Sequence, residues 1–202
     1  MPERPLIRAA RDEDAEAAAE LIYLTSPGGF DLFGGGEGRG VRLIEAAFAT
    51  PGTDCARDVI TLAELDGQVA GAMASFPTTE GDDRRRRFVR VALRRRPPWR
   101  WLRIVRVARH GARHDPAPPA QSLYVDSLAT AEGFRRRGVA AALLEAAERD
   151  ARERGLPALA LDTRATNDGA RALYERLGFE VSTEVPASPP IPALVGYVKT
   201  LG

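Results

Sequence analysis

The stretch Arg135-Arg136-Arg137-Gly138-Val139-Ala140 links two segments of different periodicity. Residues 123–129, before it, predict a strand, and residues 138–154 repeat small and apolar side chains at helical spacing. The first turn of a helix has unpaired backbone N–H groups and a partial positive charge. Gly138 and Ala140 carry little bulk, so a phosphate can approach the backbone closely. The stretch therefore predicts a turn that holds a pyrophosphate group against a helix start.

The segments around this turn follow an α/β pattern. Strands are predicted at residues 5–9, 59–65, 68–76, 123–129, 158–161, 179–185 and 194–200. Helices are predicted from Asp12 to about residue 25, where Ser26-Pro27-Gly28-Gly29 stops the helix, and at 41–49, 138–154 and 168–177, with a glycine-rich loop at 34–40. Asp66-Gly67 predicts a hairpin between two apolar runs. Hairpin strands followed by a strand–helix–strand unit predict a mixed sheet.

Residues 77–119 break this pattern and are interpreted as an insertion or an elaborated loop. Within them, residues 84–113 hold 13 arginines and no acidic residue, although the whole chain has a net charge of only +1. Residues 99–113 predict an amphipathic basic helix with Trp101, Leu102, Val105 and Ala108 on one face. Three interpretations stay open: a solvated loop, a lid beside a binding site, and a surface for nucleic acid or anionic lipid.

Composition excludes several classes of protein. The length suggests one domain, no apolar run is long enough to span a membrane, and we expect no signal peptide. Cys55 is the only cysteine, which excludes an internal disulfide and suits a reducing cytoplasm. We expect it to be an idle, buried thiol. No group of residues has metal-ligand spacing, so we predict no metal. His110 and His114 are expected to be exposed to solvent rather than catalytic.

The turn at 135–140 is neither a dinucleotide fingerprint nor a P-loop, because the required glycine and Gly-Lys-Ser/Thr positions are missing. It resembles the acetyl-CoA-binding motif Arg/Gln-x-x-Gly-x-Gly/Ala of the GCN5-related N-acetyltransferase (GNAT) superfamily, with Arg135, Gly138 and Ala140 at the marked places. A second signature of that superfamily is matched by Asn167, Ala170, Ala172, Leu173-Tyr174 and Leu177-Gly178-Phe179. The resemblance covers about residues 120–180.

The resemblance implies a fold and a set of cofactor-binding residues. The fold would be a single domain over residues 1–202, with the insertion at 77–119. Its mixed, mostly antiparallel twisted sheet would have about six to seven strands flanked by about four helices. The residues implied to bind acetyl-CoA, the acyl donor, are Leu128, Ala129, Thr130, Arg135, Arg136, Arg137, Gly138, Val139, Ala140, Ala141 and Asn167. The strand at 123–129 and the next one would part to admit the thioester.

Two catalytic residues are expected. The resemblance implies that Tyr174 is the general acid that protonates the leaving thiolate; the alternative is a core tyrosine. Asp126 is the candidate general base, because an alternating strand would put it on the same face as Leu128. A buried structural carboxylate is an equal alternative for Asp126, and Glu64 is a weaker candidate base.

The favoured function is a cytoplasmic N-acetyltransferase that moves an acetyl group from acetyl-CoA to a primary amine by direct attack in a ternary complex. The acceptor site would be formed by residues 30–40, with the insertion as a further contributor. A non-catalytic acyl-CoA sensor and a nucleic-acid-binding module are the alternatives, although nucleic acid is not the expected partner. The identity of the amine, the length of the acyl group and the choice between monomer and homodimer stay open.

Overall fold

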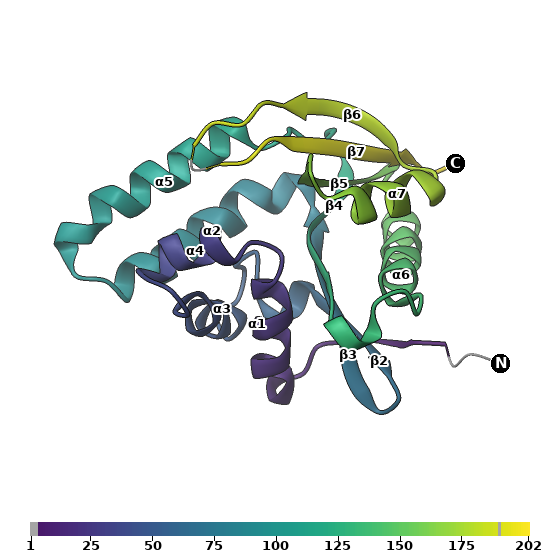
Figure 1. Ribbon diagram of the computed structural model, residues 1–202, viewed down its shortest axis with the longest axis horizontal. Coiled ribbons are helices and arrows are strands. Elements are labelled where there is room, and N and C mark those ends of the chain that lie inside the picture. Colours follow the sequence, from purple (N-terminus) through teal and green to yellow (C-terminus); the bar gives the residue numbers. More distant parts are fainter. Residues whose placement is uncertain (1–3, 190) are drawn as a thin grey trace.

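One sheet forms the frame of the molecule. A computed structural model describes residues 4–189 and 191–202. Within them, seven strands run in the order β1-β2-β3-β4-β5-β7-β6 (Figure 1). Their bounds are β1 (Leu6–Ala9), β2 (Ile60–Leu65), β3 (Gln68–Pro77), β4 (Ser122–Thr130), β5 (Ala158–Arg164), β6 (Glu180–Val185) and β7 (Leu194–Thr200). Neighbouring strands are antiparallel except for β4 and β5, which are parallel.

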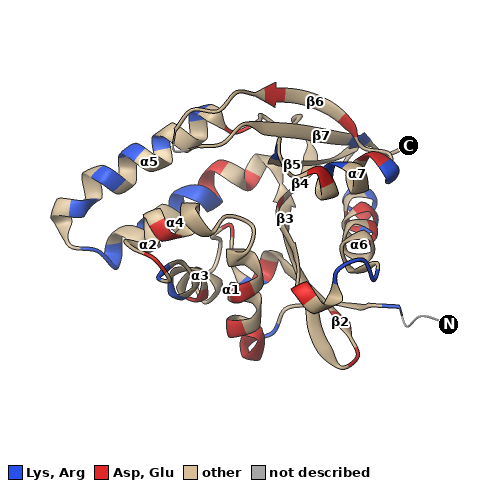
Figure 2. Ribbon diagram, viewed as in Figure 1, with Lys and Arg blue, Asp and Glu red and all other residues tan. Residues whose placement is uncertain are grey.

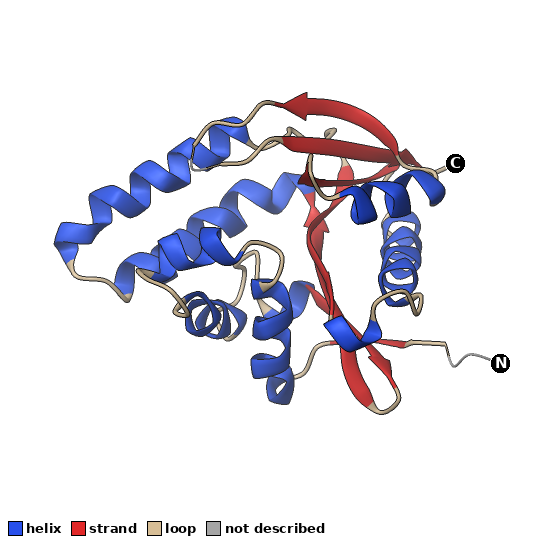
Figure 3. Cartoon of the chain, in the orientation of Figure 1, coloured by secondary structure: helices blue, strands red, loops and turns tan. Residues whose placement is uncertain are grey.

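Helices cover both faces of this sheet (Figure 3). Their bounds are α1 (Ala15–Tyr23), α2 (Pro27–Gly34), α3 (Gly40–Phe48), α4 (Gly81–Arg94), α5 (Trp101–His114), α6 (Val139–Glu153) and α7 (Asp168–Arg176). Side chains of α1, α3, α4 and α5 form one buried cluster, and those of α6 and α7 form a second one with the opposite face. None of the helices in the described part of the chain has both the length and the apolar character needed to cross a bilayer.

The predicted α/β class and the mixed, mostly antiparallel sheet are confirmed. Each predicted strand is present, and the Asp66-Gly67 hairpin forms with both residues at positive φ, 54° and 71°. The expectation of about four flanking helices was too low, because α2 and α4 lie where the sequence predicted a turn and a loop.

Helix α2 begins at the proline that was expected only to end the helix before it. Pro27 stands in the first turn of α2, where its fixed φ suits a helix start and its missing N–H is not needed. Gly35 ends the helix in the left-handed region at a φ of 81°. The carboxylate of Asp31 then accepts hydrogen bonds from the N–H groups of Gly38 and Gly40, which folds the glycine-rich loop back on the helix.

Helix α4 occupies the first half of the arginine-rich segment. Asp82 and Asp83 lie in its first turn and Arg94 lies in its last turn. Their charges are opposite in sign to the partial charges of the helix dipole at the two ends and therefore stabilise the helix. Its buried residues are Phe88, Val91 and Ala92. The ring of Phe88 makes edge contacts with the rings of Phe30 and Phe33 on α2.

Helix α5 forms as predicted, but a different face of it is buried. Ile104 is its buried residue, whereas Trp101 is 44% exposed and Leu102 is 70% exposed. The prediction of a face made by Trp101, Leu102, Val105 and Ala108 was therefore wrong for its first turn. The indole N–H of Trp101 instead donates to the carbonyl oxygens of Leu93 and Arg96, which ties the start of α5 to the end of α4.

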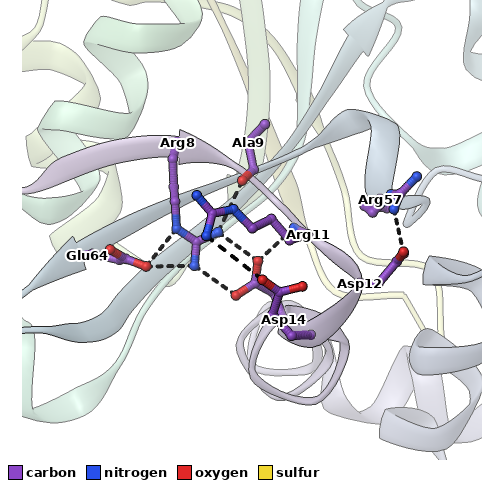
Figure 4. Close-up of polar contacts among 8 residues, drawn as sticks. Arg8, Ala9, Arg11, Asp12, Asp14, Arg57 and Glu64 are labelled. Atoms are coloured by element: carbon purple, nitrogen blue, oxygen red, sulfur yellow. Dashed lines mark hydrogen bonds and ion pairs between the residues drawn. The ribbon is translucent and has the colours of Figure 1, made fainter.

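An ion-pair network joins β1, β2 and the turn before α1 (Figure 4). The guanidinium of Arg8 donates to both carboxylate oxygens of Asp14, at 2.6 and 2.8 Å, and to the carboxylate of Glu64 at 2.6 Å. The backbone N–H of Arg11 also donates to Asp14. Hydrogen bonds from Arg8 lower the pKa of Asp14, although its burial opposes this. Glu64 therefore has a structural role here.

We expect Asp14→Asn to lower the free energy of unfolding by about 2 kcal/mol at pH 7, because the charged hydrogen bonds to Arg8 weaken. The pKa of Asp14 is lowered in the folded state, so its contribution is complete above the unfolded value of about 3.9 and is lost as the pH falls further. Urea unfolding from pH 7 to pH 3 should show the gap between variant and wild type closing at the acid end. Asp12→Asn is the matched control, since the side chain of Asp12 is 86% exposed in its pair with Arg57. An equal loss in both variants would contradict the network's role.

Candidate active site

The central feature of the site is a gap between β4 and β5. The two strands pair from Ser122 with Ala158 to Val125 with Leu161, and no further. Both strands continue beyond that point, β4 to Thr130 and β5 to Arg164. The expected parting of these strands is therefore present, and it opens in the middle of the sheet.

The edge of β4 that lines this gap is open for hydrogen bonding. Leu128, Ala129 and Thr130 pair with β3 on their other side, through Met73, Ala72 and Gly71. A strand carries hydrogen-bonding groups on both edges, and β5 no longer uses the second edge here. The three residues predicted to pair with the pantetheine arm thus border the gap.

A β-bulge interrupts β4 at Asp126. Val125 pairs with Ser75 and Ser127 pairs with Ala74, so Asp126 is the extra residue. The bulge reverses the alternation of the strand: Val125 and Leu128 both pack with the α6 cluster. Simple alternation, on which the expectation of a shared face for Asp126 and Leu128 rested, therefore does not hold through this part of β4.

The turn before α6 lies beside the open part of β4. Arg136 and Gly138 are in the left-handed region, at φ 60° and 81°, and Gly138 caps the helix. The N–H groups of Arg136 and of residues 138–141 have no backbone acceptor in the described part of the chain. Such a row of unpaired N–H groups at a helix start suits a phosphate. These are the backbone groups that the sequence predicted for the pyrophosphate.

A glycine on β3 lets this helix start approach the sheet. A Cβ atom on Gly71 would lie 2.6 Å from Cγ1 of Val139 and 2.9 Å from the carbonyl oxygen of Ala129. Any side chain at Gly71 would therefore push the start of α6 away from β3 and β4. Gly71 was not singled out in the sequence, because nothing local distinguishes it from other strand glycines.

The arginines of the turn differ in their surroundings. Arg137 donates to Asp66 of the β2–β3 hairpin at 2.8 Å and lies 5.3 Å from the centre of the Phe134 ring. Arg135 and Arg136 are exposed. The side chain of Asn167 caps α7 by accepting from the N–H of Ala170, and it also donates to the hydroxyl of Thr163 on β5.

Tyr174 lies on α7, which follows β5 in the chain. It is 6% exposed, and its ring contacts those of Phe179 and Tyr197. Burial, and then the charge of Asp162 on β5, raises the pKa of the Tyr174 hydroxyl. Its hydroxyl has no hydrogen-bond partner in the described ranges, and it stays protonated at neutral pH.

Three half-buried carboxylates meet where β4 and β5 part: Asp54, Asp126 and Asp162. Asp126 and Asp162 directly follow the last paired residues of the two strands. The hydroxyl of Tyr124 donates to Asp162, and the hydroxyl of Ser127 donates to Asp126. Oδ1 of Asp54 is buried without a hydrogen-bond partner among the described residues.

The carboxylates differ in their protonation. Burial, together with the charge of Asp126, raises the pKa of Asp54 to about 8. Burial raises the pKa of Asp162 to about 6, although the bond from Tyr124 opposes this. Burial also raises the pKa of Asp126, against the charge of Arg85. The two carboxyls titrate as a coupled pair, in which burial disfavours the charged form of both and the charge of Arg85 favours it.

Arg85 connects this cluster to α4. Its guanidinium pairs with the carboxylate of Asp115 at 2.8 Å, and its charge acts on Asp54, Asp126 and Asp162. The sequence did not single out Asp54, Asp162, Tyr124 or Arg85. Asp162 had one available signal, since it directly follows the short apolar strand predicted at 158–161. Arg85 was hidden in a run of four arginines.

Other candidates lie away from the gap. Glu64 is held by Arg8 in the network of Figure 4 and is not brought to the site. His110 and His114 are half-buried rather than exposed, because His110 lies 3.1 Å from the carbonyl oxygen of Ser188. Cys55 is 1% exposed, and burial, with the charge of Asp54, raises the pKa of its thiol. No group of three or more possible metal ligands occurs in residues 4–189 and 191–202.

A comparison with protein families tests the resemblance on which the interpretation of this turn and gap rests. The acetyltransferase (GNAT) family matches residues 42–179. The chain belongs to this family. None of the curated proteins compared with the chain matches it. The resemblance inferred from the turn and from the residues around Tyr174 is thus confirmed, and members of the GNAT family use acetyl-CoA.

Solved structures show the same fold. An acetyltransferase superposes with a TM-score of 0.69 at 24% identity, covering 98% of this chain and 100% of that chain. An N-acetyltransferase from Staphylococcus aureus Mu50 superposes with a TM-score of 0.72 at 18% identity, covering 96% of this chain and 99% of that chain. A chain of the NatC complex bound to Gag peptide and CoA superposes with a TM-score of 0.59 at 13% identity, covering 99% of this chain and 100% of that chain. At these identities the likeness concerns the fold.

We expect Gly138→Ala to weaken the binding of CoA by about 5- to 30-fold, because a side chain in the left-handed region costs about 1–2 kcal/mol and shifts the turn. Isothermal titration with CoA measures the change. Gly133→Ala, five residues earlier at a glycine with no positive φ and no atoms within 4 Å of a new Cβ, is the control. Wild-type affinity in Gly138→Ala would show that the turn geometry does not matter for CoA.

Proposed function

We propose that this GNAT protein transfers an acetyl group from acetyl-CoA to a primary amine of a small molecule or a protein, by direct attack in a ternary complex. The observation that carries the proposal is the gap between β4 and β5. An anion-binding turn, an open strand edge, a protonated tyrosine and a group of carboxylates all border it. The lone buried cysteine fits a reducing cytoplasm as the place of this reaction.

The donor would bind along β4 and the start of α6. The N–H groups of residues 136–141 would hold the pyrophosphate, with Arg135, Arg136 and Arg137 adding positive charge around it. The free edge of Leu128, Ala129 and Thr130 would pair with the pantetheine arm. Asn167 would donate to that arm from the far side of the gap, at the cost of its bond to Thr163.

Asp126 would act as the general base. The pKa of Asp54 is about 8, so Asp54 would hold a proton near neutral pH, and the charge of Arg85 favours the ionised form of Asp126. The bulge turns Asp126 out of regular alternation at the point where the strands part. It would accept a proton as the amine nitrogen forms its bond to the thioester carbonyl carbon.

Tyr174 would act as the general acid. Its raised pKa keeps the hydroxyl protonated, as an acid requires, and this hydroxyl could protonate the thiolate as the carbon–sulfur bond breaks. Backbone N–H groups freed from the ladder by the β4 bulge are candidates to stabilise the oxyanion.

The first experiment is isothermal titration with acetyl-CoA, followed by a screen of primary amines for acetylated product. Micromolar binding and turnover with at least one amine are expected. Absence of binding at high micromolar concentration would overturn the proposal, and binding without turnover of any amine would favour a non-catalytic acyl-CoA sensor.

We expect Tyr174→Phe to lower kcat by about 100-fold while leaving the dissociation constant of acetyl-CoA within about twofold, because the variant loses only the proton donor. Tyr197→Phe is the matched control: this neighbouring tyrosine is buried and bonded to Arg171 and Glu175. Steady-state kinetics and titration separate the two effects. Equal loss of kcat in both variants would assign Tyr174 to packing.

We expect Asp126→Asn to lower kcat by about 100-fold or more at pH 7. The pKa of Asp126 is raised, so the wild-type kcat should fall as the pH drops through that pKa and Asp126 becomes protonated. Asp54→Asn is the control, because an amide imitates the protonated form that Asp54 holds below a pKa of about 8. It should keep most of its activity at pH 7. If Asp54→Asn is inactive and Asp126→Asn is active, the base is Asp54.

A further inference from the structure

A hollow of about 410 Å³ lies between α2 and α5, away from the gap in the sheet. Its lining comes from α2 and the loop after it, from the second residue after the end of α4, from the residue before α5 and from the first turn of α5: Gly28, Asp31, Leu32, Gly35, Gly36, Glu37, Arg96, Arg100, Arg103 and Ile104. The two segments that the sequence suggested for the acceptor, residues 30–40 and the insertion, thus meet here.

Three arginines of this hollow have no carboxylate partner in the described part of the chain: Arg96, Arg100 and Arg103. The Nε–H of Arg96 is buried and donates to no acceptor among the described residues. Its guanidinium packs on the backbone of Gly35, where a Cβ would lie 2.8 Å from Cζ. Among the described residues, Arg100 donates only to the carbonyl oxygen of Gly35, at 3.3 Å. A buried, unpaired guanidinium N–H is unfavourable unless an acceptor reaches it.

The acidic residues of the lining do not neutralise these arginines. The carboxylate of Asp31 is occupied by the hydroxyl of Tyr23 and the N–H groups of Gly38 and Gly40. Glu37 is exposed in the loop. Burial, and then the charges of Arg39, Arg100 and Arg95, lowers the pKa of Arg96. Figure 2 shows basic residues spaced along α5 and no acidic residue on it.

We propose that this hollow binds an anionic group, a carboxylate or a phosphate, carried by the amine acceptor. Planar guanidinium groups match the oxygen pairs of both anions. The inference rests on the proposed acetyl transfer, and it adds a second anchoring point for the acceptor, separate from the reacting amine.

The length of α4 gives a scale for the distance between the two points. Arg85, whose charge acts on Asp126, lies near its start, and Arg96 follows its end at Arg94. The nine residue steps from Arg85 to Arg94 span about 14 Å of helix. About four extended residues cover the same distance. The acceptor that fits both points is a peptide amine with an acidic or phosphorylated residue about four to five positions away.

The first test measures the anion site without any turnover. Sulfate binding to the protein is measured by calorimetry, once without CoA and once with saturating CoA. In the second series CoA occupies the turn before α6, so sulfate cannot bind there. We expect Arg96→Gln combined with Arg100→Gln to weaken the sulfate affinity that remains with CoA by at least 10-fold. Arg109→Gln, an exposed arginine of α5 outside the hollow, should leave it unchanged. Equal affinity in all three proteins would overturn the site. Arg96→Lys, which keeps the charge, checks that a loss does not come from misfolding.

The second test identifies the source of the anion. The substrates are eight-residue peptides with a free amino terminus and otherwise uncharged side chains. Each peptide carries a single Glu or phosphoserine, and its position differs from one peptide to the next. We expect the KM to fall at least 10-fold for an acidic residue near the fifth position, and the advantage to vanish in the double arginine variant. The residue that gives the lower KM identifies the anion as a carboxylate or a phosphate. A KM that does not depend on the position of the charge would overturn the proposal that the hollow binds an anionic group of the acceptor. If no peptide is acetylated, the proposed function fails, and the sulfate titration still decides the site.

Discussion

The whole arrangement depends on the point at which β4 and β5 stop pairing. Parallel strands are stable when both edges are hydrogen-bonded, so a gap in mid-sheet leaves backbone groups that need another partner. The bulge at Asp126 and the small residue at Gly71 shape that gap from the β3 side. Because α6 starts beside it, an extended ligand can find strand edge and helix N–H groups in one place.

Helix α4 relates two regions of opposite charge. Near its start, Arg85 lies among carboxylates, and burial there keeps part of the cluster protonated. Beyond its end, Arg96 lies among other arginines, and burial lowers its pKa. The arginine-rich segment is therefore not uniform. One arginine offsets buried acids at the gap, and others meet in a hollow where no ion pair among the described residues joins them to a carboxylate.

Much of the fold followed from local patterns. The strands, the hairpin and the helices α1, α3, α6 and α7 have strong periodicity with glycine, proline or aspartate at their ends, which are short-range signals. Helices α2 and α4 were missed because Pro27 was interpreted as a stop and the arginines of α4 as a loop. Phe88 and Val91 were the only apolar hints for α4, and their burial depends on α2 and α3, which no local pattern describes.

The sequence by itself determined the turn at 135–140, the α7 signature around Tyr174 and hence the family, because glycine at a positive φ and a helix start are properties of a few adjacent residues. Only the tertiary structure decided which acids share a site. Asp54, Asp126 and Asp162 are far apart in the chain, and their pKa values depend on burial and on one another's charge. The same holds for Arg96 and Gly35, whose contact arises because α2 and α4 pack side by side through Phe88.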